Sequence, residues 1–150
     1  MDTETLLRSL NEHEVRYVVI GATAFPVHGY ARATLDVDVF IEATEENARK
    51  TMAALRAFGY DVSDLAVEDL LQKKVLIRQY VVQTDLHPFV KGVLWEDVWA
   101  NRVESMLGDT PVSFASLDDL IRMKRAAGRP KYVEDLRVLL RVDSRVIPVS

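Results

Sequence analysis

Apolar residues alternate with carboxylates over residues 35–41, which read LDVDVFI. Successive side chains of a β-strand point to opposite faces, so Val37, Val39 and Ile41 would share one face. Asp36 and Asp38 would share the other face, with their Cα atoms about 6.6 Å apart. The pattern predicts a strand that presents two carboxylates to one side.

Other runs rich in β-branched and aromatic residues also favour strands. In the stretch 80–87, Val82, Thr84 and Leu86 alternate with polar residues. The alternation places a third acid, Asp85, on one strand face together with His87. The further strands are predicted at 15–20, 75–78, 80–87, 102–107 and 111–114, the last two joined through a turn at Gly108 and Asp109.

Apolar residues at helical spacing, preceded by capping residues, predict the helices. We expect Thr3, Thr44 and Ser116 to be N-caps. Gly59 should end the helix that begins after Thr44, and Gly128 should end the helix that begins after Ser116. Further helices are expected from just after Gly21 to a C-cap at Gly29, over 67–73, around Trp95, Val98 and Trp99, and over 131–141. Both tryptophans are interpreted as core residues.

The mixture of strands and helices predicts an α/β (α+β) chain. No internal repeat and no Gly-, Pro- or Ser-rich linker interrupts the 150 residues. A chain of this length is the usual size of one domain. We therefore expect a single domain over residues 1–150.

Composition narrows the function classes. Hydrophobic residues make up 49% and charged residues 28%, which argues against disorder. No apolar run approaches the roughly 20 residues that cross a bilayer, and the acidic N-terminus does not resemble a signal peptide. There is no cysteine, so thiolate metal sites are excluded. We expect a cytoplasmic protein without a membrane partner.

The charge distribution is uneven although the net charge is only −4. This balance does not indicate a broad nucleic-acid surface. A local basic surface that binds phosphate groups is still compatible with this net charge. Basic residues crowd the last thirty positions, among them Lys124, Arg125, Arg129, Lys131 and Arg137.

Two features suggest chemistry. Like charges as close as Asp36 and Asp38 raise each other's pKa unless a cation or hydrogen-bond donors compensate, so in a cleft the pair would favour a metal. The predicted strand 15–20 ends at Gly21 and turns into a helix, whose N-terminal N–H groups would favour a phosphate. Taken alone, the acidic pair is more typical of a solvated strand face, and the glycine turn is more typical of an ordinary strand–helix connection.

Together these segments resemble a known family. The segments are YVVIGA at 17–22, HGYARATLDVD at 28–38, SLDDLI at 116–121 and KRAAGRPK at 124–131. They are similar to the DNA polymerase β-like nucleotidyltransferase superfamily. The likeness is to its small bacterial members, related to minimal nucleotidyltransferases and abortive-infection-type toxin transferases. It covers roughly residues 5 to 140 and implies a nucleotidyltransferase fold, a mixed β-sheet flanked by helices.

The resemblance also implies an activity. An NMP would move from an NTP, the substrate, to a hydroxyl acceptor on a partner protein or an RNA. Asp36, Asp38 and Asp85 would hold Mg²⁺ or Mn²⁺, because hard cations prefer oxygen ligands. In the family the third acid orients or deprotonates the acceptor hydroxyl, and Asp85 matches it by strand context.

Four further positions match nucleotide-binding positions of the family. Gly21 corresponds to the glycine of the phosphate turn. Ala22 follows it where the family usually has Ser or Gly, which removes one hydroxyl donor. Arg32 and Lys124 are candidate triphosphate ligands, although each is also compatible with an ordinary surface role. His87 either supports the neighbouring carboxylates or packs beside Pro88.

Alternatives of other classes stay open. One is a degenerate member that binds a nucleotide or a partner without transfer, as an antitoxin does. Another is a structural α/β module. The three acids favour an active enzyme, whereas Ala22 and the small size favour binding alone. In one version of the enzyme hypothesis, the protein belongs to a toxin–antitoxin system. Because 150 residues leave little room for acceptor recognition, a partner chain or a homo-oligomer would complete the site.

Overall fold

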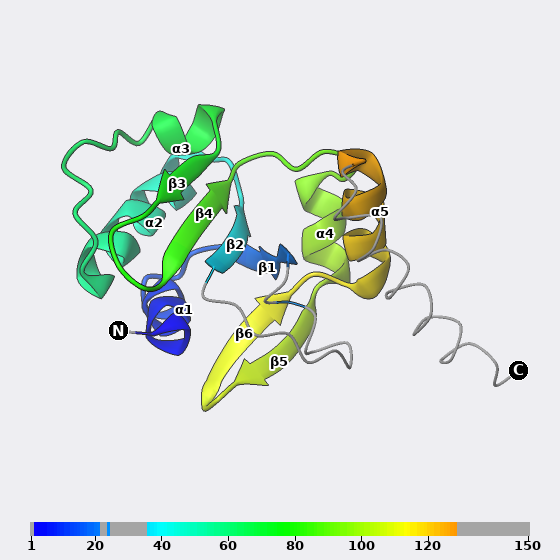
Figure 1. Cartoon of the computed structure of the whole chain (residues 1–150), viewed down its shortest axis with the longest axis horizontal. Helices are drawn as coiled ribbons and strands as arrows, with labels where there is room; N and C mark the ends of the chain where they lie inside the picture. The colour runs from blue at the N-terminus through cyan, green and yellow to red at the C-terminus, as the bar shows by residue number, and fades with distance from the viewer. Residues whose placement is uncertain (1, 22–23, 25–35, 129–150) are drawn as a thin grey trace, which may run out of the picture.

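A computed structural model describes residues 2–21, 24 and 36–128 (Figure 1). Strands and helices follow one another along this part of the chain. The strands are β1 (Tyr17–Ile20), β2 (Asp36–Ile41), β3 (Val75–Ile77), β4 (Gln83–His87), β5 (Val103–Leu107) and β6 (Thr110–Phe114). The helices are α1 (Thr3–Glu12), α2 (Glu45–Phe58), α3 (Asp69–Gln72), α4 (Trp95–Asn101) and α5 (Leu117–Ala127).

The strands of the described residues form one mixed sheet in the order β3-β4-β2-β1-β6-β5. β2 pairs with β1 antiparallel and with β4 parallel, and β1 pairs with β6 parallel. The two outer pairs, β3 with β4 and β5 with β6, are antiparallel. The predicted mixed sheet flanked by helices is confirmed, and β2 with its two carboxylates lies in its interior.

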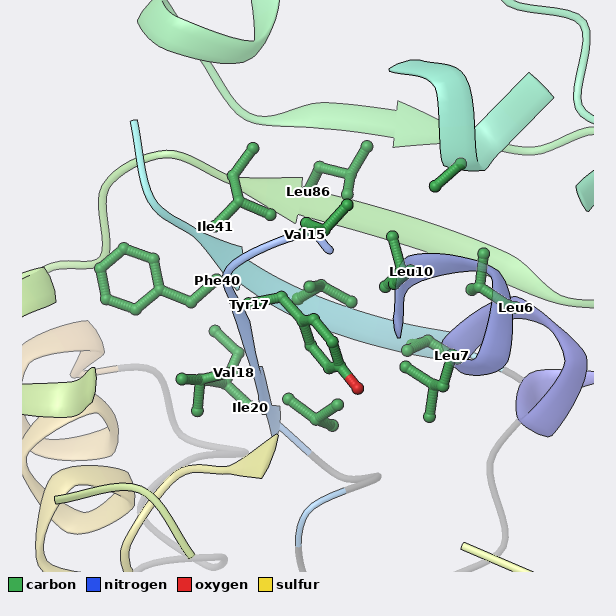
Figure 2. Close-up of a cluster of buried hydrophobic side chains, with 14 of the residues drawn as sticks. Leu6, Leu7, Leu10, Val15, Tyr17, Val18, Ile20, Phe40, Ile41 and Leu86 are labelled. Carbon is green, nitrogen blue, oxygen red and sulfur yellow. The ribbon is translucent and has the colours of Figure 1, made fainter. Parts of the chain in front are cut away.

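One face of β2 belongs to the hydrophobic core. Val37 and Val39 are buried there, across from Thr84 and Leu86 of β4. Figure 2 shows the leucines of α1 gathered with Tyr17 and the apolar side chains of the sheet. Burial of this face determines which way β2 points its other side chains, because a shift of one residue would bury both aspartates.

The opposite face of β2 is partly covered. Phe40 follows the aspartates on this face and is 1% exposed. Its ring meets that of Trp95 of α4 edge-on, with centroids 5.2 Å apart, and Trp95 stacks on Trp99. Val98 is fully buried, so the helix packs through the side that its sequence predicted. The aromatic cover lies at the Phe40 end of β2, beyond the carboxylates.

Most predicted boundaries are confirmed. Thr44 and Ser116 cap α2 and α5, and Gly59 and Gly128 end them. The prediction for Thr3 is wrong: Asp2 is the N-cap of α1, because its carboxylate accepts the N–H of Thr5 at 2.8 Å. The strands predicted at 15–20 and 80–87 begin later, at Tyr17 and Gln83. The helices predicted after Gly21 and over 131–141 lie outside the described residues.

None of the described helices combines the length and the apolar character that a membrane-spanning segment needs.

The side chain of Asn47 in α2 connects the residue before β1 with the residue after β2 through hydrogen bonds. Its Oδ1 accepts the N–H of Arg16 at 2.8 Å, and its Nδ2 donates to the carbonyls of Arg16 and Glu42 at 3.0 and 2.9 Å. Arg16 precedes β1 and Glu42 follows β2. The side chain of this buried residue therefore satisfies three backbone groups at once.

We expect Asn47→Ala to lower the free energy of unfolding by about 1–3 kcal/mol, because it leaves the N–H of Arg16 without its partner. The carbonyls of Arg16 and Glu42 each lose one hydrogen bond but keep those from the N–H groups of Glu42 and Thr44. Urea unfolding would measure the loss. Arg49→Ala, at an exposed position of the same helix, should change stability by no more than about 0.5 kcal/mol. Equal losses in the two variants would contradict the role given to Asn47.

Candidate active site

The three predicted acids lie on two neighbouring parallel strands. In the register of β2 and β4, Asp38 is directly opposite Asp85, and Asp36 is opposite Gln83. Residues paired in this way point to the same face of a sheet. Asp38 and Asp85 are therefore side by side on the face away from the α1 leucines, although 47 positions separate them in the sequence.

His87 completes a compact group with these two acids. Its Nε2 lies 2.9 Å from Oδ1 of Asp38. One ligand atom each from Asp38, Asp85 and His87 can be chosen so that all three lie within 4.8 Å of one another. Asp36, two residues before Asp38, is exposed and is not one of the three. The aspartates thus differ in environment despite their matched positions on the strand.

Positive charge already gathers at the acids. Nη1 of Arg78 donates to Oδ1 of Asp85 at 2.6 Å, and Nζ of Lys74 lies 3.9 Å from Oδ2 of the same carboxylate. The Asp85 hydrogen bond is the main cause of a raised pKa at Arg78, and the charges of Asp36 and Asp38 add to it. All three predicted acids therefore stabilise the positive charge of one guanidinium, that of Arg78. The surroundings of these acids thus favour a cation.

Asp38 is held in its ionised form. Burial by itself would raise its pKa, but the hydrogen bond from His87 and the positive charges of Lys74 and Lys124 help to outweigh burial, so the pKa of Asp38 is lowered. Lys124 belongs to α5, so a residue far from Asp38 in the sequence contributes to the electrostatic potential at its carboxylate. An ionised, partly buried carboxylate is suited to bind a cation at neutral pH.

Gly21 places the end of β1 against Asp38. Its φ of +71° lies in the left-handed region, which residues with a Cβ rarely adopt. A Cβ on Gly21 would lie 2.7 Å from Oδ2 of Asp38. The glycine is therefore required both by the backbone and by the approach of the carboxylate. The predicted phosphate turn and the predicted metal strand meet at this contact.

Two of the predicted nucleotide-binding residues, Ala22 and Arg32, lie outside the described residues. Lys124 lies within them and acts on Asp38 through its charge. The sequence did not single out Arg78 or Lys74. Both flank β3, and only its antiparallel pairing with β4 brings them to Asp85. One sequence signal could have identified them. The predicted short strand has a basic residue at each end and is followed in the sequence by the strand that carries Asp85.

The donor set fits a divalent cation. Carboxylate oxygens suit hard cations such as Mg²⁺ and Mn²⁺, and imidazole nitrogen is a common metal ligand. Metal–ligand bonds of about 2.1 Å allow opposite ligands to stand about 4.2 Å apart, close to the 4.8 Å limit within which the three atoms lie. The three ligand atoms therefore lie close to the spacing that one ion requires.

Comparison with known proteins identifies the family of the chain. No curated protein matches the chain. A family model described as "nucleotidyltransferase of unknown function" matches residues 1–144, nearly the whole length. The activity class that the motifs implied is therefore confirmed, whereas the relation to the DNA polymerase β-like superfamily stays a prediction. The chain belongs to the nucleotidyltransferase family DUF6036.

Proposed function

We propose that this protein transfers an NMP from an NTP to a hydroxyl group on a partner protein or an RNA, with the help of Mg²⁺ or Mn²⁺. The observation that carries the proposal is the direct pairing of Asp38 with Asp85 on parallel strands, with Gly21 packed against Asp38. Membership of a nucleotidyltransferase family supports the reaction class. The acceptor and the cation are parts of the proposal.

The reaction is a displacement at the α-phosphorus. The acceptor oxygen forms a bond to this phosphorus, the bond to the β-phosphate oxygen breaks, and pyrophosphate leaves. A divalent cation held by Asp38 and Asp85, with Asp36 at the edge of the site, would neutralise phosphate charge and polarise the α-phosphoryl group. Asp85 orients the acceptor hydroxyl and takes its proton, directly or through a water.

Basic side chains around the acids serve the triphosphate. Lys124 acts on Asp38 from α5, and Lys74 and Arg78 reach Asp85 from either end of β3. An NTP brings several negative charges to a site that already balances acids with bases. We assign Lys124 to the triphosphate, together with Gly21 at the end of β1 and with Ala22 and Arg32, which follow it in the sequence. Positioning and charge neutralisation supply most of the catalysis in phosphoryl chemistry.

Labelled nucleotides test which phosphorus is attacked. With α-³²P-NTP and a host lysate, we expect label on a protein or an RNA and release of pyrophosphate. With γ-³²P-NTP, addition of the protein should label no macromolecule beyond those labelled in the lysate alone. The sequence has neither a phosphate-binding loop of the Gly-Lys-Ser/Thr type nor a kinase glycine loop. Transfer of the γ-label would overturn the proposed reaction.

A binding-only function is the second candidate, and one contact favours it. Arg78 already occupies Asp85 through a 2.6 Å ion pair, as expected where an internal cation replaces a metal. The alanine at position 22 removes a hydroxyl donor from the turn. Such a protein would bind a nucleotide or a partner chain, as an antitoxin does. NTP binding without transfer to any acceptor would favour this candidate.

Replacing Arg78 tests whether its guanidinium competes with a metal cation for the carboxylate of Asp85. Because the guanidinium must leave for a cation to bind, Arg78→Gln should tighten Mn²⁺ binding about two- to fivefold, the value of a partly exposed ion pair. Isothermal titration calorimetry without nucleotide would detect the change. Arg49→Gln removes an exposed ion pair with Glu45 and should leave affinity unaltered. Unchanged affinity in Arg78→Gln would show that this arginine does not compete.

A further inference from the structure

His87 sits where a third metal ligand would sit. It belongs to β4, two residues beyond Asp85 and on the same face of the sheet. Its side chain is 15% exposed, and that of Asp85 is 14% exposed. Nε2, the outermost ring nitrogen, points to Oδ1 of Asp38 at 2.9 Å. An imidazole this enclosed has few directions from which water reaches it.

The geometry points to His87 as a direct metal ligand, in a site with two carboxylate oxygens and one imidazole nitrogen. This inference rests on the proposed function, since it concerns the same cation. The ligands are then Asp38, Asp85 and His87, whereas the resemblance implied Asp38 and Asp85 together with the more exposed Asp36.

The spacing of the atoms supports ligation. Two adjacent ligands of an octahedral ion with bonds of about 2.1 Å stand about 3.0 Å apart. The 2.9 Å between Nε2 of His87 and Oδ1 of Asp38 matches that edge. When the metal binds, the proton that Nε2 donates to Asp38 leaves to solvent, with Nδ1 keeping or taking the ring proton, so that the Nε2 lone pair faces the ion. A histidine that served only to orient Asp38 would need this one contact. His87 is in addition within 4.8 Å of a carboxylate oxygen of Asp85, so it faces both ligands.

A mixed donor set changes which cation is preferred. Mg²⁺ requires oxygen ligands and loses its water reluctantly, whereas first-row transition metals accept imidazole. Two carboxylates and a neutral imidazole also carry one negative charge less than three carboxylates. We therefore expect the protein alone to bind Mn²⁺ and Co²⁺ at least about tenfold more tightly than Mg²⁺, because affinity rises along the transition series.

Pulsed electron paramagnetic resonance of the full-length protein loaded with Mn²⁺ tests ligation without any activity assay. A coordinated imidazole should give ¹⁴N couplings to the manganese spin. We expect these couplings in the wild type and their loss in His87→Gln, whose side-chain amide still reaches Asp38. Mn²⁺ affinity should fall at least about tenfold in the same variant, within the range seen when the surroundings of a metal are altered.

His13 provides the matched control. Its Nδ1 lies 2.8 Å from the carbonyl oxygen of Ser9 at the end of α1, and His13→Gln should keep both the couplings and the affinity. Bound Mn²⁺ without ¹⁴N coupling in the wild type would overturn the inference, as would the absence of Mn²⁺ binding. The wild-type spectrum decides the matter even if His87→Gln does not fold.

The two proposals can fail separately. Nitrogen coupling in a protein that transfers no nucleotide would support the ligand assignment and refute the proposed enzyme. Transfer of the α-label by a protein whose bound Mn²⁺ shows no nitrogen coupling would do the reverse.

Discussion

Asp38→Asn should reduce transfer of label from α-³²P-NTP by at least about 10²- to 10³-fold, the loss typical when a group that stabilises transition-state charge is removed. Asp38 is the residue on which the other features converge. It pairs with Asp85 in the sheet, contacts His87, and packs against Gly21. An amide at this position keeps the shape of the side chain but lacks the charge that would hold a cation.

The control for this variant is Asp109→Asn. Asp109 is an exposed acid at the turn between β5 and β6, in the hairpin that extends away from β2 and β4 in Figure 1. It should retain the wild-type rate. Initial rates at saturating NTP separate lost catalysis from weaker binding, and circular dichroism would verify the fold. Wild-type transfer by Asp38→Asn would refute the proposed mechanism.

Gly21→Ala should lower the free energy of unfolding by about 2–4 kcal/mol. A residue with a Cβ at φ +71° costs about 1–2 kcal/mol, and overpacking adds a similar amount. The added methyl group would lie 2.7 Å from Oδ2 of Asp38, so either the carboxylate or the turn must move. Displacement of Asp38 should also weaken Mn²⁺ binding, by about tenfold or more.

Gly128→Ala separates the two causes. Gly128 has a φ of +63°, close to that of Gly21, but a Cβ there would meet nothing within 4 Å. Its substitution should cost only the backbone contribution of about 1–2 kcal/mol and leave Mn²⁺ affinity unchanged. Urea unfolding and Mn²⁺ titration of both variants provide the comparison. Equal effects on metal affinity would show that Gly21 does not position Asp38.

Local physics explains why much of the site was predictable. Alternation along a strand assigned Asp36 and Asp38 to one face and Val37 and Val39 to the other, and the burial pattern of β2 agrees. The same rule separated Asp85 from the buried Leu86 on β4. The caps Thr44 and Ser116 were readable because a side-chain oxygen near free N–H groups acts within three residues. Such preferences need no knowledge of the rest of the chain.

Only the tertiary structure decided which strands are neighbours. The parallel pairing of β2 with β4 joins strands that are separated in the sequence by α2, α3 and β3, and no local preference specifies it. That pairing places Asp85 opposite Asp38, and His87 against Asp38. The pairing of β3 with β4 likewise brings Arg78 to Asp85.

The sequence by itself therefore determined which side chains could share a face, because side-chain direction follows from the period of the strand. Their distances and charge partners were determined by the pairing of remote strands, because this depends on burying one continuous core rather than on neighbouring residues. The carboxylates of the site were legible from their spacing. The contact of the His87 imidazole with Asp38, and the guanidinium of Arg78 beside Asp85, followed only from the pairing of β3, β4 and β2 in the sheet.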